Sequence, residues 1–576
     1  MSDSESQMEK EAVETVAPGT PVQDEAKQAT DAGQKSLTET QSRPAKAADL
    51  LISNLDIKRL IELDACTRCG ECLTWCPVYD QDEKESIIPR TKVMDFLRIL
   101  RSQHGIVGQI IKSDKSPGAL KKLLSALFRY REITDQDVRD FAQNLYECST
   151  CGQCHVVCPA NIDTVNLWED IRRLIVQAGY GPLESQKALV KSVKSYDNPW
   201  QQPRAGRTKW ARRAKKENLI ADLPKEMKKT GAKVLLFLGC TASYDINVKQ
   251  VAVSTINILE MLGIDYGVFG KDEKCCGSVM LRMGDPEFER IASDNLKMFH
   301  DAGFQTLITS CAGCFKTIKE DYPRVGKLHF EVMHTVEFLR RLYEEKKLVF
   351  KNRVEKKITY HDPCHLGRAS GVFDDPRFIL EAIPGLELVE MPRNREYSRC
   401  CGAGGGLKSG YPDIQNRMAQ RRVKEAEETG ARELVSACPF CYQGLQVGIT
   451  ATDSPLIMRD ISFLVEEALK DDSVPEKEEK EKREIEEPGK EPEPGEDKKR
   501  ERDERREKRL KRQQEKKEKP KKEELRVDQE PEVDQQPEMA QEPEKDRNQE
   551  RDEKREKRLK RLQEKKAGRK ANAEAL

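Results

Sequence analysis

Between residues 90 and 135, apolar residues recur three and four positions apart, which is the spacing of amphipathic helices. VMDFLRILRSQ (93–103) and GALKKLLSALFRYRE (118–132) are the clearest examples. The polar face of the second stretch is basic and carries Lys121, Lys122, Arg129 and Arg131. Such a face is typical of an ordinary exposed helix, and it would also suit docking on a membrane or on an acidic partner.

Further along the chain, one pattern of strands and helices occurs twice. Each copy opens with an apolar run that ends on a cysteine, continues with a second apolar run that ends on a C-x-x-C motif, and closes with an amphipathic helix. The runs are AKVLLFLGC (232–240), FQTLITSCAGC (304–314) and HTVEFLRRL (334–342) in the first copy, and KKITYHDPC (356–364), ARELVSACPFC (431–441) and RDISFLVEEAL (459–469) in the second. The repetition predicts a duplicated α/β domain at residues 230–348 and 349–471. In an open α/β sheet, ligands bind at the carboxyl ends of the strands, where these cysteines stand.

Composition separates these elements from both ends of the chain. Residues 1–46 are mainly Glu, Gln, Ser, Thr, Ala and Pro, and over residues 472–576 Lys, Arg, Glu and Pro replace nearly all apolar residues. Neither segment can bury a core, so both are expected to be disordered. RDERREKRLKRQQEKK (502–517) recurs as RDEKREKRLKRLQEKK (551–566), which predicts a solvated tail or, alternatively, a basic arm that contacts anionic lipid, RNA or a partner.

The 576-residue chain contains 18 cysteines, and all of them lie between the two polar ends. No run approaches the ~18 apolar residues that a membrane span needs, and MSDSESQMEKEAVE at the N-terminus has no feature of a signal peptide. We therefore expect a cytoplasmic protein, in which many cysteines indicate metal or redox chemistry rather than disulfides. The formal net charge is zero and says little, and no nucleic-acid partner is expected.

Eight of the cysteines form two copies of the spacing C-x2-C-x2-C-x3-C-P, at CTRCGECLTWCP (66–77) and CSTCGQCHVVCP (148–159). This spacing holds [4Fe–4S] cubes, and in two-cluster ferredoxins the fourth cysteine of each motif ligates the other cluster. The pattern predicts two cubane clusters. One would be held by Cys66, Cys69, Cys72 and Cys158, and the other by Cys148, Cys151, Cys154 and Cys76. Zinc would not require the third cysteine or the trailing proline, and His155 is expected to be a spectator.

The long segment between the two motifs has the helical spacing described above. We therefore assign residues 47–229 to a helical two-cluster ferredoxin module followed by a linker, and the whole chain to a multidomain protein.

The remaining ten cysteines fall into two sets of five with nearly equal spacing. The first set is Cys240, Cys275, Cys276, Cys311 and Cys314, and the second is Cys364, Cys400, Cys401, Cys438 and Cys441. The adjacent pair in each set is followed by a glycine, which would permit close backbone approach or a positive φ. A zinc site would account for four thiolates of each set but not for the fifth. CPFC (438–441) by itself would also match a thioredoxin-like dithiol.

Other residues distinguish the surroundings of the second set. His361 and His365 flank Cys364, and either would supply a proton to a departing thiolate or simply hydrogen-bond the end of the strand. Arg368 would face an anionic substrate or pair locally. GAGGGLKS (402–409) matches neither the dinucleotide fingerprint nor the P-loop, so no flavin or nucleotide site is predicted.

The order of a single cysteine, CCG and C-x-x-C, together with HDPCHLGR (361–368) and CCGAGGG (400–406), resembles the CCG signature of heterodisulfide reductase catalytic subunits. A helical two-cluster ferredoxin followed by two CCG domains resembles the D-type subunit of that family. It is also similar to the K subunit of the sulfite-reduction-associated, menaquinol-oxidising membrane complex. The iron–sulfur subunits of anaerobic glycerol-3-phosphate dehydrogenase and of glycolate or lactate oxidase look related too. The resemblance covers residues 50–470 and leaves both ends unexplained.

The resemblance implies that each set of five cysteines holds a noncubane [4Fe–4S] cluster, so one or two such clusters are expected. The implied cofactor-binding residues are Cys240, Cys275, Cys276, Cys311 and Cys314, and the implied catalytic residues are Cys364, Cys400, Cys401, Cys438, Cys441, His361 and His365. The implied enzyme is an oxidoreductase subunit that passes electrons through the cubanes to a CCG-bound cluster, which reduces a disulfide or trisulfide. The alternative is a relay subunit that carries electrons from a flavin-dependent glycerol-3-phosphate, lactate or glycolate dehydrogenase to quinone.

A chain without a flavin motif or a membrane span must receive its electrons from other subunits. The resemblance implies a membrane-embedded haem b subunit that oxidises quinol, or other electron-transfer subunits, and hence a peripheral place on the cytoplasmic face of the membrane. The expected substrate is a small-molecule or protein disulfide. Oxygen-sensitive clusters would also imply an anaerobic host.

Overall fold

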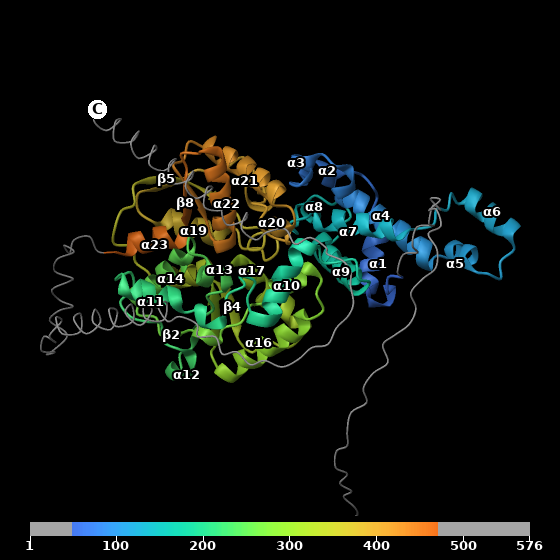
Figure 1. Cartoon of the computed structure of the whole chain (residues 1–576). Coiled ribbons are helices and arrows are strands. Elements are labelled where there is room, and N and C mark those ends of the chain that lie inside the picture. Colours follow the sequence, from blue (N-terminus) through green and yellow to red (C-terminus); the bar gives the residue numbers. More distant parts are fainter. Residues whose placement is uncertain (1–48, 471–576) are drawn as a thin grey trace, which may run out of the picture. The chain divides into compact units, whose positions relative to one another are not determined.

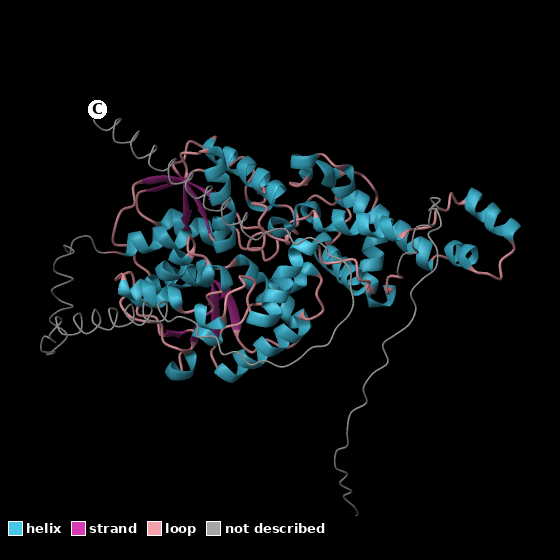
Figure 2. Ribbon diagram, viewed as in Figure 1, coloured by secondary structure: helices cyan, strands magenta, loops and turns pink. Residues whose placement is uncertain are grey.

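An all-helical N-terminal module precedes two four-stranded sheets in the computed structural model, which describes residues 49–470 (Figures 1 and 2). The disorder and the repeat expected at the two ends of the chain lie outside the described residues. None of the helices in the described part has both the length and the apolar character needed to cross a bilayer.

The N-terminal module is built on amphipathic helices that share one apolar core. Its helices are α1 (Ile57–Asp64), α2 (Glu71–Trp75), α3 (Tyr79–Asp82), α4 (Pro89–His104), α5 (Ile106–Lys112), α6 (Gly118–Leu127), α7 (Asp135–Tyr146), α8 (Gln153–Val156) and α9 (Thr164–Gln177). Phe96 of α4 stacks on Phe141 of α7, and Trp168 of α9 is buried in the same core. A reciprocal capping box of Thr134 and Asp137 begins α7.

The helix expected over 93–103 corresponds to α4, but the one expected over 118–132 is shorter. Helix α6 ends at Leu127 because Arg129 adopts a left-handed backbone with a φ of 47°. The N–H groups of Phe128 and Tyr130 close this turn on the Leu124 and Ser125 carbonyls. Apolar periodicity alone does not reveal such a stop.

The two α/β domains have the same parallel topology, which confirms the predicted duplication. The strands are β1 (Val234–Leu236), β2 (Tyr266–Gly267), β3 (Thr306–Thr309) and β4 (Glu331–His334), then β5 (Lys356–His361), β6 (Leu386–Leu388), β7 (Glu433–Ser436) and β8 (Ile457–Asp460). Their orders are β2-β1-β3-β4 and β6-β5-β7-β8. Helices cover both faces, so the apolar residues in the middle of the central strands are fully buried, namely Leu235, Ile308, Ile358 and Val435.

The helices of the two domains interlock in a reciprocal way. The first domain contributes α13 (Cys240–Tyr244), α14 (Lys249–Met261), α15 (Ser278–Met283), α16 (Phe288–Ala302), α17 (Ala312–Lys316) and α18 (Thr335–Glu344). The second contributes α19 (Asp374–Ala382), α20 (Leu407–Gly410), α21 (Pro412–Glu427), α22 (Pro439–Thr452) and α23 (Ile461–Leu469). The last helix of each domain packs on the long helix that follows the first strand of the other, α23 on α14 and α18 on α19. One apolar core consequently runs through both domains.

The segment that connects the module to the first sheet contains α10 (Glu184–Tyr196), α11 (Lys209–Lys216) and α12 (Met227–Thr230). Val193, Trp210 and Met227 in this segment belong to the core of the α/β domains. A small separate core joins the N-terminal module to the second α/β domain. It combines Val78 and Ile87 with Leu407, Ile414 and Met418, and it includes Cys151 and Cys400.

Candidate metal centres and the cavity between the α/β domains

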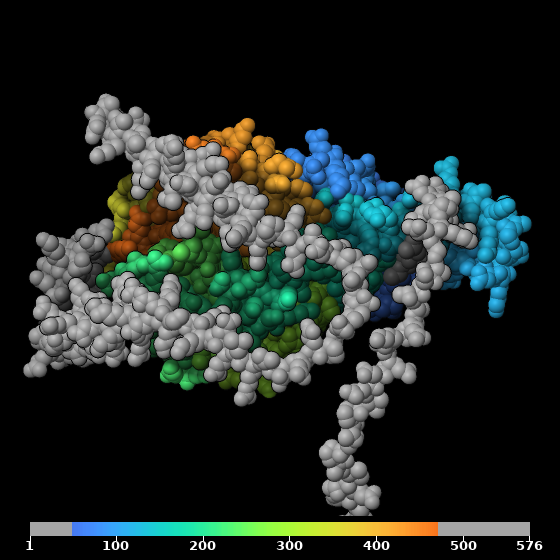
Figure 3. All heavy atoms as spheres, in the orientation of Figure 1, coloured from blue at the N-terminus to red at the C-terminus, as the bar shows by residue number. Residues whose placement is uncertain are grey.

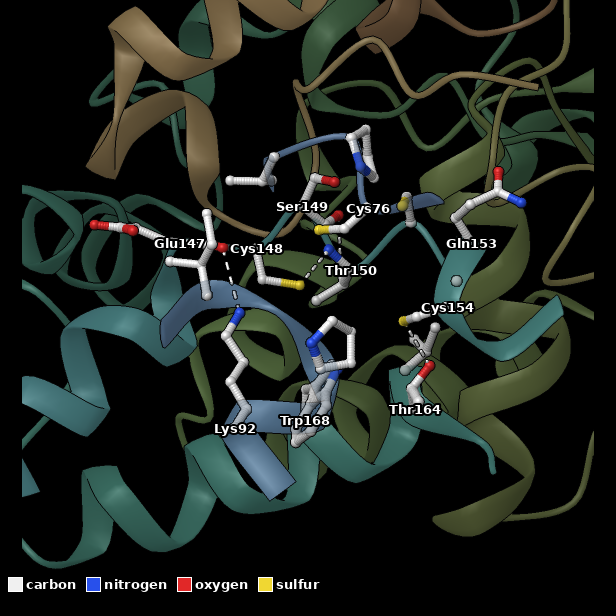
Figure 4. A pocket seen from close by; sticks show the side chains of 17 residues that line it. Cys76, Lys92, Glu147, Cys148, Ser149, Thr150, Gln153, Cys154, Thr164 and Trp168 are labelled. Atoms are coloured by element: carbon white, nitrogen blue, oxygen red, sulfur yellow. Dashed lines mark hydrogen bonds between the residues drawn. The ribbon is translucent and has the colours of Figure 1, made fainter. Parts of the chain in front are cut away.

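The fourth cysteine of the first ferredoxin motif lies with the first three cysteines of the second. Cys76, Cys148, Cys151 and Cys154 line one pocket, and the labelled members of this set surround it in Figure 4. Cys76 ends α2, whereas the other three stand between α7 and α9, so the folding of the helices brings the two motifs together. We call these four residues the inner set. Crossed ligation would use these four residues together.

The chemistry of the inner set suits a cationic cluster. Burial raises the pKa of the Cys76 thiol to about 11, although the nearby charge of Lys92 opposes the shift. The pKa of Cys154 also lies well above its usual value because of burial. Hydrogen bonds to sulfur are already present, since the Thr150 N–H donates to Cys148 Sγ at 3.4 Å. Thiols of this kind become thiolates when a metal takes the proton's place, so the residues fit an iron–sulfur cluster.

The other predicted set is nearer the surface. Cys66, Cys69 and Cys72 lie close enough together to influence the pKa of Cys72, which burial raises to about 11. Cys158 packs against the same apolar core as Cys66. Cys69 is exposed. We call Cys66, Cys69, Cys72 and Cys158 the outer set.

A cavity of about 420 Å³ lies between the two α/β domains, at the carboxyl ends of their strands. Nine of the ten remaining cysteines line it: Cys240, Cys275, Cys276, Cys311 and Cys314 from the first domain, and Cys364, Cys401, Cys438 and Cys441 from the second. Cys311 and Cys438 occupy equivalent positions, directly before α17 and α22. The duplicated fold thus places both sets on opposite walls of a single space.

Contacts between thiols link the two sets. Cys276 interacts with Cys314 in the first domain, and Cys401 lies 3.5 Å from Cys441 in the second, measured between the sulfur atoms. Across the cavity, the thiols of Cys311 and Cys438 interact directly. The two domains therefore meet through sulfur at the C-x-x-C loops.

Cys400, the tenth cysteine, faces the N-terminal module. Its thiol interacts with Cys151 of the inner set and with Cys364. Arg368 spans this junction, because its Nε donates to the Cys151 carbonyl at 2.7 Å and one Nη donates to the Ser398 carbonyl at 2.6 Å. Of the two roles considered for Arg368, its contacts are those of local pairing.

The glycine run explains how the two motifs approach so closely. A Cβ on Gly405 would stand 2.5 Å from the Ser149 carbonyl carbon and 2.6 Å from the Cys148 oxygen. Gly405 also has a φ of 62°, which glycine adopts without strain. The buried guanidinium of Arg172 donates to the carbonyls of Gly405 and Cys148 and secures the contact. The run serves as a docking surface for the ferredoxin motif.

The two histidines flanking Cys364 have different surroundings. His365 lines the cavity, and its Nε2 has no hydrogen-bond partner among the described residues. His361 is buried at the end of β5, and its Nδ1 accepts a hydrogen bond from Nε of Arg422 at 3.1 Å. One ring nitrogen of His361 lies within 4.8 Å of the Cys401 and Cys441 sulfurs. Burial is the main reason why the pKa of both rings falls to about 3. Both are therefore neutral, with one N–H each.

The cavity wall also carries two cations. Arg282 is buried and forms ion pairs with Glu169 at 3.0 Å and with Asp321 at 3.6 Å. Among the described residues, the ammonium of Lys408 has one hydrogen-bond partner, the Gln443 oxygen at 2.6 Å, and it lies over the Phe440 ring at 5.9 Å from the ring centre. The residues that line this cavity include no carboxylate, so the ammonium of Lys408 is a charge at the wall without an ionic partner in the described part of the chain.

Comparison with known proteins agrees with this architecture. The 4Fe-4S dicluster domain model matches residues 62–162, and the cysteine-rich CCG domain model matches residues 234–319 and 358–446. The D-type subunit of the dihydromethanophenazine:CoB–CoM heterodisulfide reductase of Methanosarcina barkeri is 39% identical over 424 residues, which cover 72% of this chain and 96% of that relative. The chain belongs to the family of heterodisulfide reductase D-type subunits.

Two more distant matches cover a large part of this chain. The EtfAB:quinone oxidoreductase of Syntrophomonas wolfei is 29% identical over 70% of this chain and 57% of its own length. Among solved structures, a hypothetical protein from Helicobacter pylori aligns with a TM-score of 0.37 at 12% identity, over 65% of this chain and 72% of that one. Family membership identifies the chain as an iron–sulfur oxidoreductase subunit and confirms the predicted fold class.

Several residues at the site were missed in the sequence analysis. Lys408 stands in the glycine-rich run 402–409, for which the sequence predicted no role. Arg172 and Arg422 belong to no motif, and only the fold brings them to the cysteines. The same is true of Arg207, which donates to Cys240 Sγ at 3.2 Å while it pairs with Glu273. An arginine distant in sequence from the cysteines carries no local signal of such a role.

Proposed function

We propose that this protein reduces a disulfide or trisulfide in the cavity between its two CCG domains. The observation that carries the proposal is the meeting of both cysteine sets at one cavity, where Cys311 and Cys438 interact. For a disulfide, the S–S bond breaks, two electrons and two protons are consumed, and two thiols form. A substrate bound between the walls would present one sulfur to each domain.

The donor sets support two cubane clusters and one or two noncubane clusters. Clusters held by these cysteines would supply the two electrons. Cys69 is exposed, so the outer set is the side on which an electron donor can dock. Cys151 and Cys400 join the inner set to the second domain, which makes that domain the entry to the cavity. This arrangement suits a haem b membrane subunit that oxidises quinol, or another electron-transfer subunit, as the electron donor. With the haem b subunit, this chain would lie peripherally on the cytoplasmic face of the membrane.

The residues around the cavity suggest how the substrate would be held. Lys408 offers a positive charge to an anionic arm of the substrate, because its only polar partner is a neutral amide. The neutral ring of His365 can donate an N–H to a sulfur that gains charge as the bond breaks. His361 does not line the cavity and would act on the Cys401 and Cys441 sulfurs as a positioning residue.

A relay role remains the second candidate, and the similarity to the EtfAB:quinone oxidoreductase favours it. In that case a flavoprotein would deliver electrons that this chain passes on to quinone. A relay does not require a substrate cavity between the two cysteine sets, whereas a disulfide reductase does. The cavity therefore supports the reductase over the relay.

Electron paramagnetic resonance separates the two candidates. Anaerobically purified protein would be oxidised and titrated with mercaptopropionate, and its iron counted. For the reductase we expect about sixteen irons and a signal that appears on oxidation and shifts with the thiol. The same iron content would favour the relay if the protein gave only the signals of reduced cubanes and these signals did not change when the thiol was added. Roughly eight irons together with zinc would contradict the noncubane assignment.

A further inference from the structure

Helices α5 and α6 form a hairpin at the far end of the N-terminal module (Figures 1 and 3). Helix α6 packs against α5, and none of its residues is buried. The hairpin takes no part in either cysteine set or in the cavity. The large apolar side chains of α6 instead have no covering partner among the described residues.

The apolar side of α6 is unusually open. Leu120, Leu123 and Leu127 lie three and four positions apart and are 39%, 62% and 70% exposed, and Phe128 directly after the helix is 58% exposed. Ile106 at the start of α5 is 76% exposed. A stripe of large apolar side chains at helical spacing is ordinarily buried against a core. An exposed apolar stripe of this kind indicates a surface that binds another molecule.

The charge of the hairpin indicates which kind of molecule would bind to this stripe. Residues 106–131 contain six basic residues and a single acidic one, Asp114. Of the six, only Arg131 pairs with a carboxylate of the described residues, Asp137 at 3.1 Å. The remaining basic residues, which are free to meet negative groups, are Lys112, Lys115, Lys121, Lys122 and Arg129.

We propose that the α5–α6 hairpin binds the surface of an anionic lipid bilayer. Helix α6 would lie in the plane of the interface, with its leucines and Phe128 among the acyl chains. The lysines would reach the negative headgroups with their long stems. An amphipathic helix with an apolar face and a cationic polar face binds membranes in this way, by apolar burial together with attraction to anionic lipid. The proposal is independent of the reaction in the cavity.

Co-sedimentation of the full-length chain with vesicles tests the proposal. We expect binding to phosphatidylcholine vesicles that contain phosphatidylglycerol, and much weaker binding to phosphatidylcholine alone. The double variant Leu123→Glu/Leu127→Glu should lower the partition coefficient at least about tenfold. Val349→Glu replaces an equally exposed apolar residue outside the hairpin, 61% exposed, and should leave binding unchanged. Because both charged ends of the chain are present in every variant, any binding that they provide is common to all.

The lysines give a second and separate measurement. Lys121→Gln/Lys122→Gln should weaken binding to the anionic vesicles by about fivefold for each lysine removed, and added salt should erase the difference. Equal binding of the wild type and both hairpin variants would overturn the proposal. The proposal would also be overturned if the wild-type chain did not bind vesicles but bound a purified membrane subunit, and if the leucine variant lost that binding. The apolar side of α6 would then be a protein interface.

Discussion

Lys408 is half-buried in the wall of a cavity that otherwise consists mainly of sulfur, small and apolar groups. Burial lowers its pKa, and the negative groups that oppose the shift are Asp245 and Cys401. Asp245 also accepts a hydrogen bond from the same Gln443 amide whose oxygen binds Lys408. The ammonium group is thus oriented by a neutral side chain and keeps its charge for a ligand.

Replacing Lys408 should change substrate affinity and not the chemical step. We expect Lys408→Gln to raise KM for the disulfide of mercaptopropionate about tenfold with little effect on kcat, because one charge-assisted contact is lost in ground and transition state alike. Steady-state kinetics with a chemical reductant measures this. Lys408→Arg is the matched control and should recover most of the affinity. A similar KM increase for the uncharged disulfide of mercaptoethanol would contradict the assigned role.

At the scale of elements, the glycine run before α20 and the helices α9 and α15 determine how the N-terminal module meets the α/β domains. Gly405 permits the backbone of the second ferredoxin motif to touch the CCG loop. Glu169 on α9 and Arg282 on α15 form a buried ion pair across the same junction. Arg172 connects the two features, because its guanidinium donates to the carbonyls of both Arg282 and Gly405.

Gly405→Ala should therefore separate the two motifs. The new methyl group would collide with backbone atoms, which cannot move aside as a flexible side chain would. We expect a loss of about 2 kcal/mol or more in unfolding free energy and an altered inner-set spectrum. Gly371→Ala is the control, because Gly371 also has a positive φ, 74°, but meets nothing within 4 Å. It should show only the backbone cost of about 1 kcal/mol. Chemical denaturation followed by circular dichroism compares the two, and equal losses would mean that the contact contributes nothing.

Removal of the buried carboxylate at the same junction should be costly. Glu169→Ala leaves the buried Arg282 with Asp321 as its one ionic partner, and we expect a loss of about 3 kcal/mol. Arg173 and Glu289 pair across the same two regions at the surface. Glu289→Ala should accordingly cost less than about 1 kcal/mol. Thermal or denaturant unfolding measures the free energy of unfolding of the two variants. If Glu169→Ala lowers it no more than Glu289→Ala does, the Glu169–Arg282 pair does not contribute to stability.

At the scale of the whole molecule, the cysteines form an ordered series. The outer set lies at the surface, the inner set follows, Cys151 and Cys400 form the junction, and the cavity between the domains comes last. The inner set combines cysteines of both ferredoxin motifs, the Cys151–Cys400 contact joins a ferredoxin motif to a CCG motif, and the cavity brings the two CCG domains together. In the proposed function, this series would be the path of electrons from the exposed end of the N-terminal module to the space between the sheets.

The crossed arrangement predicts which cysteine variants behave alike. Cys76→Ser and Cys148→Ser remove ligands from the same pocket, although they belong to different motifs, and should lose the same reduced-cubane signal. Cys72→Ser, in the same motif as Cys76, should instead lose the other signal. Paramagnetic resonance of the dithionite-reduced proteins tests the assignment. Matching spectra for Cys76→Ser and Cys72→Ser would show that each motif binds its own cluster.

Local patterns were sufficient for much of this description. The ferredoxin spacing, the two sets of five cysteines and the repeated strand–helix order all depend on residues close together in the chain, and the family and fold class followed from them. The same periodicity placed α4 correctly but extended α6 too far, because a left-handed residue after Leu127 leaves no apolar signal.

Only the tertiary structure decided how these parts combine. The apolar faces of the four interlocking helices bury one another, and that packing brings the two sheets together around a common cavity. The contact of Cys151 with Cys400, the docking role of the glycine run and the place of Lys408 in the wall all result from it. Such contacts join residues far apart in sequence, so their geometry depends on close packing of the whole core rather than on any local pattern.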